Sequence, residues 1–163
     1  MPVWLRATIF ILLAPGSVAG WLPWYVAGSP RAPWSVAHGW WRAGAVLTLI
    51  GWAVLLWCAR DFALRGRGTP APYDAPRSLV TSGLYRYLRN PMYVAVLTAI
   101  LGQAIWYRSA SVALYAVIIA LCCHTFVMLY EEPRLTSLFG DAYTEYCRRV
   151  PRWLPRSTKQ GRR

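Results

Sequence analysis

Four long apolar runs divide this chain of 163 residues, and they constrain its fold more than any other feature. They cover residues 4–26, 41–59, 91–107 and 110–130. Each run is close to the roughly 17–25 residues that cross the hydrocarbon core of a bilayer as a helix. The chain is also 56% hydrophobic, whereas soluble domains are usually roughly 45–50% apolar. The sequence therefore predicts an all-α, polytopic membrane protein with about four transmembrane helices.

Breaks in the runs add detail to this prediction. Pro15 and Gly16 lie within the first run, and a proline inside a helix kinks or breaks it. Only Arg6 precedes that run's apolar stretch, and no clean cleavage site is followed by a soluble domain, so we interpret the run as a true span. The last two runs are joined through residues 107–109, a turn so tight that it predicts an antiparallel helical hairpin.

A Gly/Pro-rich stretch at residues 66–76 lies between the second and third runs, and its composition excludes a regular helix. We place it over the cytoplasmic mouth of the bundle. We expect an N-terminal two-helix membrane region over residues 1–59. Residues 60–163 would form a core made of this linker, the hairpin and a basic C-terminal segment.

The charges are strongly asymmetric. The net charge is +12, from 18 Lys and Arg against 6 Asp and Glu. Because the basic residues alternate with long apolar runs, anionic lipid headgroups are favoured as partners over nucleic acid. Fifteen of the cations fall on one side of the predicted spans and three on the other: Arg31, Arg42 and Arg108. The positive-inside rule then places both termini in the cytoplasm, and we expect an integral protein of a bacterial inner membrane.

A polar block, LVTSGLYRYLRNPMY, runs from Leu79 to Tyr93 and leads into the third run. Pro91 suits the first turn of a helix, and Asn90 is expected to cap it with its side chain. Arg89 beside a helix N-terminus is a natural site for a carboxylate or phosphate. The faces of Tyr85 and Tyr93 can hold a cation or stack on a base. The alternative is that these residues only anchor the helix at the membrane interface.

The fourth run is expected to end at Glu131 and Glu132, where two carboxylates repel each other. Either they form a solvated helix end, with Arg134 and the tail arginines as neutralising partners, or they hold a cation or accept a proton. We favour the second interpretation because acids at a membrane edge are costly and often functional. His124 lies seven residues earlier, on the same face of a regular helix, as a catalytic candidate or a hydrogen-bonded structural residue.

Several common site patterns are missing from the sequence. It contains no GxGxxG, P-loop, HExxH or Ser/His/Asp pattern, and its four cysteines show no metal-ligand spacing. The polar block, the acidic pair and the ending FGxxYxxY…VPRWLP, within residues 139–155, together resemble the isoprenylcysteine carboxyl methyltransferase and phospholipid methyltransferase superfamily. The resemblance covers roughly residues 60–155.

The resemblance implies an integral-membrane methyltransferase that uses S-adenosylmethionine without a Rossmann domain, and that holds it in a cytoplasmic pocket. The acceptor would be a membrane lipid or lipidated substrate: an isoprenylcysteine-like carboxylate, a phospholipid amine or another lipid. Glu131 would be catalytic, and Arg89, His124 and Glu131 would contact the acceptor. The implied cofactor contacts are Arg77, Ser78, Leu79, Val80, Tyr85, Asn90, Pro91, Met92, Tyr93 and Glu132.

Two departures from the family pattern matter. The family block usually has His where this chain has Asn90, which cannot transfer a proton at neutral pH. Residues 124–130 also lack the arginine that isoprenylcysteine enzymes place a turn before the acidic cluster, which weighs against a prenylcysteine substrate.

Residues 66–68, Gly-Arg-Gly, resemble the glycine motif of phospholipid methyltransferases. The alternatives are a membrane reductase that uses NADPH, related to sterol reductases, and a non-catalytic membrane scaffold.

Overall fold

The structure is a computed structural model that describes residues 3–28, 39–62, 64 and 78–155, and every regular element in these residues is helical. The polar block contains one 3-10 turn, η3 (Gly83–Arg86). The α-helices are α1 (Val3–Leu13), α2 (Leu22–Val26), α3 (Trp40–Asp61), α4 (Pro91–Tyr107), α5 (Ala110–Phe126), α6 (Glu132–Phe139) and α7 (Asp141–Arg149).

Three helical stretches are long and apolar enough to cross a membrane: Ile9–Val26, Trp40–Asp61 and Ala110–Phe139. The fourth run, α4, is a shorter apolar helix of 17 residues. The predicted all-α, polytopic membrane fold is therefore confirmed.

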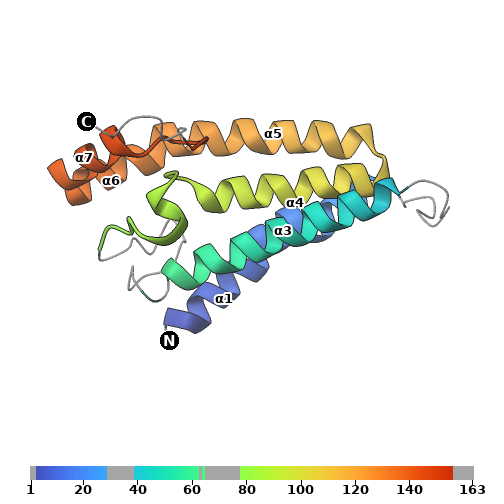
Figure 1. Cartoon of the computed structure of the whole chain (residues 1–163), viewed down its shortest axis with the longest axis horizontal. Helices are drawn as coiled ribbons and strands as arrows, with labels where there is room; N and C mark the ends of the chain where they lie inside the picture. Colours follow the sequence, from blue (N-terminus) through green and yellow to red (C-terminus); the bar gives the residue numbers. More distant parts are fainter. Residues whose placement is uncertain (1–2, 29–38, 63, 65–77, 156–163) are drawn as a thin grey trace, which may run out of the picture.

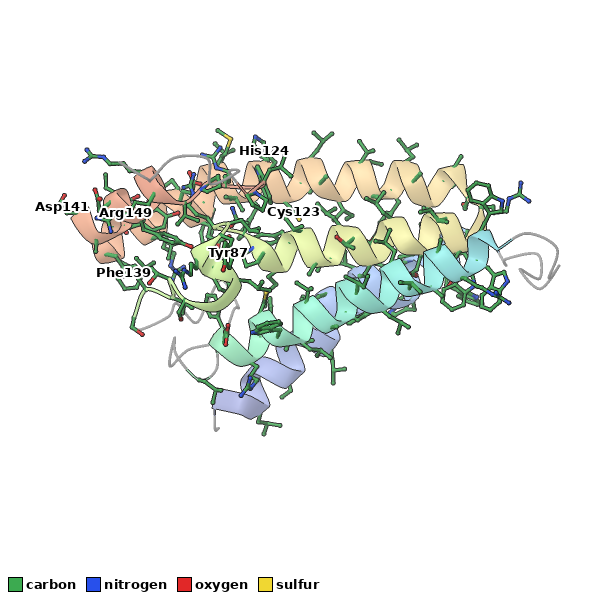
Figure 2. The ribbon with its side chains drawn as sticks, in the orientation of Figure 1. Tyr87, Cys123, His124, Phe139, Asp141 and Arg149 are labelled. Carbon is green, nitrogen blue, oxygen red and sulfur yellow. The ribbon has the colours of Figure 1, made fainter. Side chains whose placement is uncertain are left out.

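The helices form a bundle with one polar end. In Figure 1, α4 lies between α3 and α5, and α1 crosses behind α3. The start of α1, the end of α3, the segment before α4 and the short helices α6 and α7 lie at the same end of the molecule. Figure 2 shows that charged side chains gather there, near the labelled Asp141 and Arg149. We call this the polar end.

Helices α3 and α4 pack with their backbones in close contact. A Cβ atom added to Gly51 would lie 2.6 Å from the backbone nitrogen of Ala99, and one added to Gly102 would lie 2.5 Å from that of Thr48. The hydroxyl of Thr48 donates across the interface to the carbonyl of Ala99 at 3.4 Å. Small residues of this kind let membrane helices approach closely enough for dispersion contacts to hold them together.

The predicted hairpin of α4 and α5 is confirmed. Arg108 ends α4 in the left-handed conformation, with φ of 50°, which turns the chain sharply. Ser109 then caps α5, because its hydroxyl oxygen accepts a hydrogen bond from the backbone N–H of Val112 at 3.3 Å. This geometry places the start of α4 beside the far end of the α5 helix.

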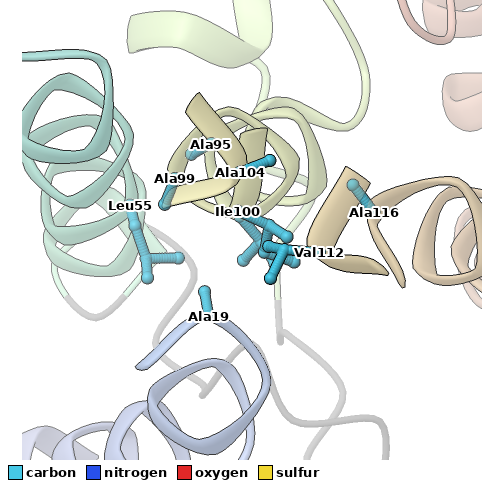
Figure 3. Close-up of a cluster of buried hydrophobic side chains, with 9 residues drawn as sticks. Ala19, Leu55, Ala95, Ala99, Ile100, Ala104, Val112 and Ala116 are labelled. Atoms are coloured by element: carbon cyan, nitrogen blue, oxygen red, sulfur yellow. The ribbon is translucent and has the colours of Figure 1, made fainter. Parts of the chain in front are cut away.

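Regular α-helix ends just before Pro15, as the Pro-Gly pair predicts, although the stretch Ile9–Val26 remains helical. Helix α1 ends at Leu13, and a π-helical turn, η1 (Ser17–Trp21), separates it from α2. Its residue Ala19 joins a core cluster with Leu55 of α3, Ile100 of α4 and Val112 of α5 (Figure 3). All four apolar runs therefore meet in one core.

Two smaller clusters fix the polar end. Cys58 of α3 packs with Val80 and Tyr85 of the polar block. Tyr146 of α7 packs with Tyr143 and Val150, and its hydroxyl donates to the carbonyl of Tyr85 at 2.6 Å. Burial raises the pKa of both the Tyr85 and Tyr146 phenols, so each stays protonated at neutral pH and able to donate. The C-terminal helix is thus attached to the segment before α4.

Candidate functional site

The hairpin brings together Tyr93 of the polar block and Glu131 of the acidic pair. Tyr93 lies in the first turn of α4, and Glu131 is the last residue of a second π-helical turn, η4 (Val127–Glu131), which continues α5. The Tyr93 hydroxyl donates to Oε2 of Glu131 at 2.9 Å. Within the described part of the chain, no Lys or Arg forms an ion pair with Glu131. The site thus offers a carboxylate beside an aromatic ring.

Glu132 faces different partners from its neighbour. Its carboxylate accepts from Arg89 Nη1 at 2.9 Å and from Arg152 Nε and Nη2 at 2.7 and 2.8 Å. The three side chains are only 13–29% exposed. The hydrogen bonds to Glu132 raise the pKa of the Arg152 guanidinium. Arg89 Nη1 also donates to the Cys147 sulfur at 2.8 Å. Glu132 therefore pairs with two arginines of the protein, and its contact with a cofactor stays a prediction.

The C-terminal segment, Val150–Trp153, is bound to the start of α4. The backbone N–H of Arg89 donates to the carbonyl of Pro151 at 2.9 Å. The side-chain amide of Asn90 donates to the carbonyl of Arg152 at 3.2 Å. Asn90 does occupy the N-cap position of α4, but its side chain makes no capping hydrogen bond, so that expectation was wrong. The amide instead satisfies a backbone carbonyl of the C-terminal segment.

Trp153 is a site residue that was not among the sequence-predicted site residues, although it lies within the VPRWLP ending. Its ring lies edge-on to Tyr93, with centroids 6.4 Å apart, and 5.9 Å from the ring of His124. Its indole N–H donates to Nδ1 of His124 at 3.1 Å. His124 therefore has a hydrogen-bond partner in the C-terminal segment. The Trp153 ring contacts both His124 and Tyr93 and so connects them. The VPRWLP ending was the signal that pointed to this residue.

The remaining residues of the polar block support the site more than they line it. Tyr85 is only 6% exposed, and its ring packs edge-on against Phe62, so neither face is open for stacking. Val80 and Pro91 are also buried, and Met92 packs on the core. Of the other residues expected to contact the cofactor, Leu79 packs beside the Tyr143 cluster and Ser78 is exposed. Arg77 lies outside the described residues, as do Gly66 and Gly68 of the glycine motif.

The acidic pair does not end a helix, so that prediction was wrong. The chain stays helical from Ala110 to Phe139, through α5, η4 and α6. Pro133 would normally stop a helix, but the π-helical turn before it accommodates the proline. Arg134 does not neutralise the pair either, because its guanidinium contacts the hydroxyl and ring of Tyr130. Among the described arginines of the tail, Arg152 pairs with Glu132.

Comparison with known proteins agrees with this geometry. A model of the phospholipid methyltransferase family matches residues 40–142, which include α3, the polar block, the hairpin and the acidic pair. The chain belongs to this family.

Curated relatives match part of the chain. The chain is 34% identical over 101 residues to the cobalt-zinc-cadmium resistance protein CzcN of Cupriavidus metallidurans, covering 62% of this chain and 42% of that protein. It is 34% identical over 95 residues to a phosphatidylethanolamine N-methyltransferase of Paracoccidioides brasiliensis, covering 54% and 9%. It is 35% identical over 78 residues to the protein-S-isoprenylcysteine O-methyltransferase of Schizosaccharomyces pombe, covering 47% and 33%.

The chain thus spans less than half the length of each of these relatives. No solved structure matches it.

Proposed function

We propose that this protein transfers a methyl group from S-adenosylmethionine to an acceptor carried by a membrane lipid or a lipidated molecule. The observation that carries the proposal is the contact between Tyr93 and Glu131 at the polar end of a membrane bundle. It joins the two motifs, the polar block and the acidic pair, within the region that matches the phospholipid methyltransferase family.

The residues at the polar end fit a cofactor that is both a cation and an amino acid. Glu131 offers a carboxylate without a cationic partner among the described residues. The Tyr93 ring lies beside it, and the Trp153 ring lies edge-on to Tyr93. Aromatic faces and carboxylates attract a positive charge at short range. The Nε atom of Arg89 is buried without a hydrogen-bond partner in the described structure, and such a donor suits a carboxylate.

The cofactor, when bound, supplies an electrophilic methyl group on a sulfonium, and loss of that methyl group leaves an uncharged thioether. Tyr93 and Glu131 favour the charged form, which helps an uncharged product to leave. Methyl transfer is an in-line displacement, so holding acceptor and donor in line supplies much of the rate enhancement. With an amine acceptor, Glu131 takes the amine proton; with a carboxylate acceptor no base is needed.

The charges around the site favour a phospholipid amine over a prenylcysteine carboxylate. Arg152 is paired with Glu132. Arg89 is paired with it through Nη1, and its Nε is assigned above to the cofactor carboxylate. Residues 124–130 contain no arginine. The Glu131 carboxylate would repel an anionic acceptor and attract a protonated amine. We further propose that the polar end and both termini face the cytoplasm, where basic residues of the tail contact anionic headgroups.

Calorimetry with detergent-solubilised protein tests the cofactor. We expect S-adenosylhomocysteine at up to millimolar concentration to bind and to raise the melting temperature, because a ligand of the native state alone stabilises it. NADPH serves as the comparison: stabilisation by NADPH alone would support a membrane reductase. Protein shown to be folded that responds to none of S-adenosylhomocysteine, S-adenosylmethionine and NADPH would fit a scaffold and refute the proposal.

A further inference from the structure

The acidic pair lies where the helix changes its winding. In the π-helical turn η4, the backbone N–H of Glu132 donates to the carbonyl of Val127, five residues back rather than four. Pro133 follows immediately, within the first two positions of α6. A proline ring collides with the carbonyl four residues earlier, here that of Leu129, and donates no hydrogen bond to it. The wider turn removes that collision while the helix continues.

The first run repeats this arrangement far from the site. In η1 the backbone N–H of Leu22 donates to the carbonyl of Ser17, again five residues back, and Pro23 follows at once. Pro23 and Pro133 thus hold the same position relative to a π-helical turn. This recurrence indicates that the proline, and not a contact peculiar to the acidic pair, accounts for the wider turn.

The extra residue in the turn decides where the two carboxylates point. Each residue of an α-helix turns the direction of its side chain by about 100°. A regular helix through residues 127–132 would therefore place Glu131 and all later residues differently relative to α5. In the observed winding, Glu131 meets Tyr93 of α4, while Glu132 meets Arg89 and Arg152.

We propose that Pro133 is a positioning residue: it holds the π-helical turn and thereby sets the rotation at which Glu131 meets Tyr93. Its consequence for turnover rests on the proposed methyl transfer, whereas its effect on helix rotation does not. The competing account is that the ion pairs of Glu132 alone hold the turn, in which case Pro133 is dispensable.

The variant Pro133→Ala tests the proposal. We expect the turn to relax to an α-helical one, and kcat to fall at least about tenfold because Glu131 leaves its place as an acid–base group. Adding Glu131→Gln to Pro133→Ala should lower kcat further by less than about threefold. Pro133 acts through Glu131, so the losses of the two single variants do not add. Pro23→Ala, the matched control, should leave kcat unchanged.

A deletion provides the rescue. Leu129 is 74% exposed, and removing it from Pro133→Ala leaves one residue fewer in the turn. An α-helical turn then restores the original rotation of the acidic pair, and kcat should recover. Wild-type kcat in Pro133→Ala, or a loss that the deletion does not reverse, would overturn the proposal.

Spin labels provide a readout that does not depend on activity. Leu121 and Leu138 lie before and after the turn, and both are exposed, so cysteines there accept labels on a background without native cysteines. We expect Pro133→Ala to shift the distance between the labels and the deletion of Leu129 to restore it. An unchanged distance would overturn the proposal. If the distance shifts in Pro133→Ala but the wild-type protein transfers no methyl group, the role of Pro133 is supported and the proposed function is refuted.

Discussion

The side-chain amide of Gln103 in α4 donates to the backbone carbonyl of Ala19 in η1, at 2.5 Å. The hydroxyl of Tyr115 in α5 donates to the neighbouring carbonyl of Val18, at 2.9 Å. These carbonyls lie four and five residues before Pro23, which has no N–H to offer either of them. Two side chains of the hairpin thus replace the donor that the proline removes, and they attach the broken first run to the hairpin. In a bilayer core no water would do so.

We expect Gln103→Leu to lower the free energy of unfolding by about 1 kcal/mol, the scale of hydrogen bonds between membrane helices. Leucine keeps much of the buried volume but leaves the Ala19 carbonyl without this donor. Thr98→Val is the control, because the Thr98 hydroxyl donates within its own helix, to the Val94 carbonyl. Unfolding in detergent micelles measures both variants, and equal losses would contradict a specific role for Gln103.

We expect the polar end to face the cytoplasm. Single cysteines at Arg86 and Arg108, which are exposed at opposite ends of the bundle, report sidedness on a background without native cysteines. A membrane-impermeant thiol reagent should label position 86 only from the cytoplasmic side of sealed vesicles, and position 108 only from the other side. Position 74, outside the described residues, should behave like 86. Labelling of position 86 from outside would reverse the topology inferred from the fifteen cations.

The spans and the hairpin could be predicted because length, apolar composition and a three-residue connection are local properties of the sequence. The meeting of Tyr93 and Glu131 followed from them, since a hairpin brings its two open ends together. The path of the helix past Pro133 could not be predicted, because proline ends helices more often than it follows a π-helical turn.

The partners of the polar block depend on contacts distant in the sequence. The Asn90 amide reaches a carbonyl 62 residues away instead of capping its own helix. Tyr85 is buried because Cys58 and Phe62 of the α3 region and Tyr146 of α7 all reach it. The local sequence pattern predicts neither the distant contact of Asn90 nor the burial of Tyr85, since asparagine and tyrosine also occur at exposed membrane interfaces.

The contact of Glu132 with Arg152 is expected to hold the C-terminal segment in place. Arg152→Gln leaves a partly buried carboxylate with one cation fewer, and Glu132→Gln leaves two guanidinium groups without their shared partner. In a double-mutant cycle on unfolding free energy we expect a coupling of roughly 0.5–3 kcal/mol. The control pair is Glu145 and Arg149 on α7, 2.6 Å apart but largely exposed, where we expect less than about 1 kcal/mol. Equal coupling in both pairs would contradict the anchoring role.

The last prediction separates the roles of Tyr93 and Glu131, whose side chains touch. If the Tyr93 ring contacts the cofactor, Tyr93→Ala should weaken its binding by roughly 1–2 kcal/mol, the scale of a partly desolvated cation–π contact. Tyr93→Phe should retain most of that binding, because it keeps the ring and removes only the hydroxyl that donates to Glu131. Calorimetry with S-adenosylhomocysteine would understate the effect, since that ligand carries no sulfonium, so we would titrate S-adenosylmethionine as well.

Glu131→Gln completes the comparison, since glutamine keeps the size and the hydrogen bonding of the side chain but removes its charge. If Glu131 serves the acceptor, cofactor affinity should stay within a few-fold while turnover falls on the order of a hundredfold or more, the usual scale for a lost acid–base group. Turnover is measured as transfer of labelled methyl groups to total lipid extract. Full activity in Glu131→Gln would remove the carboxylate from the mechanism, and would favour an acceptor that needs no base. A fall in cofactor affinity as large as that of Tyr93→Ala would instead assign Glu131 to the cofactor.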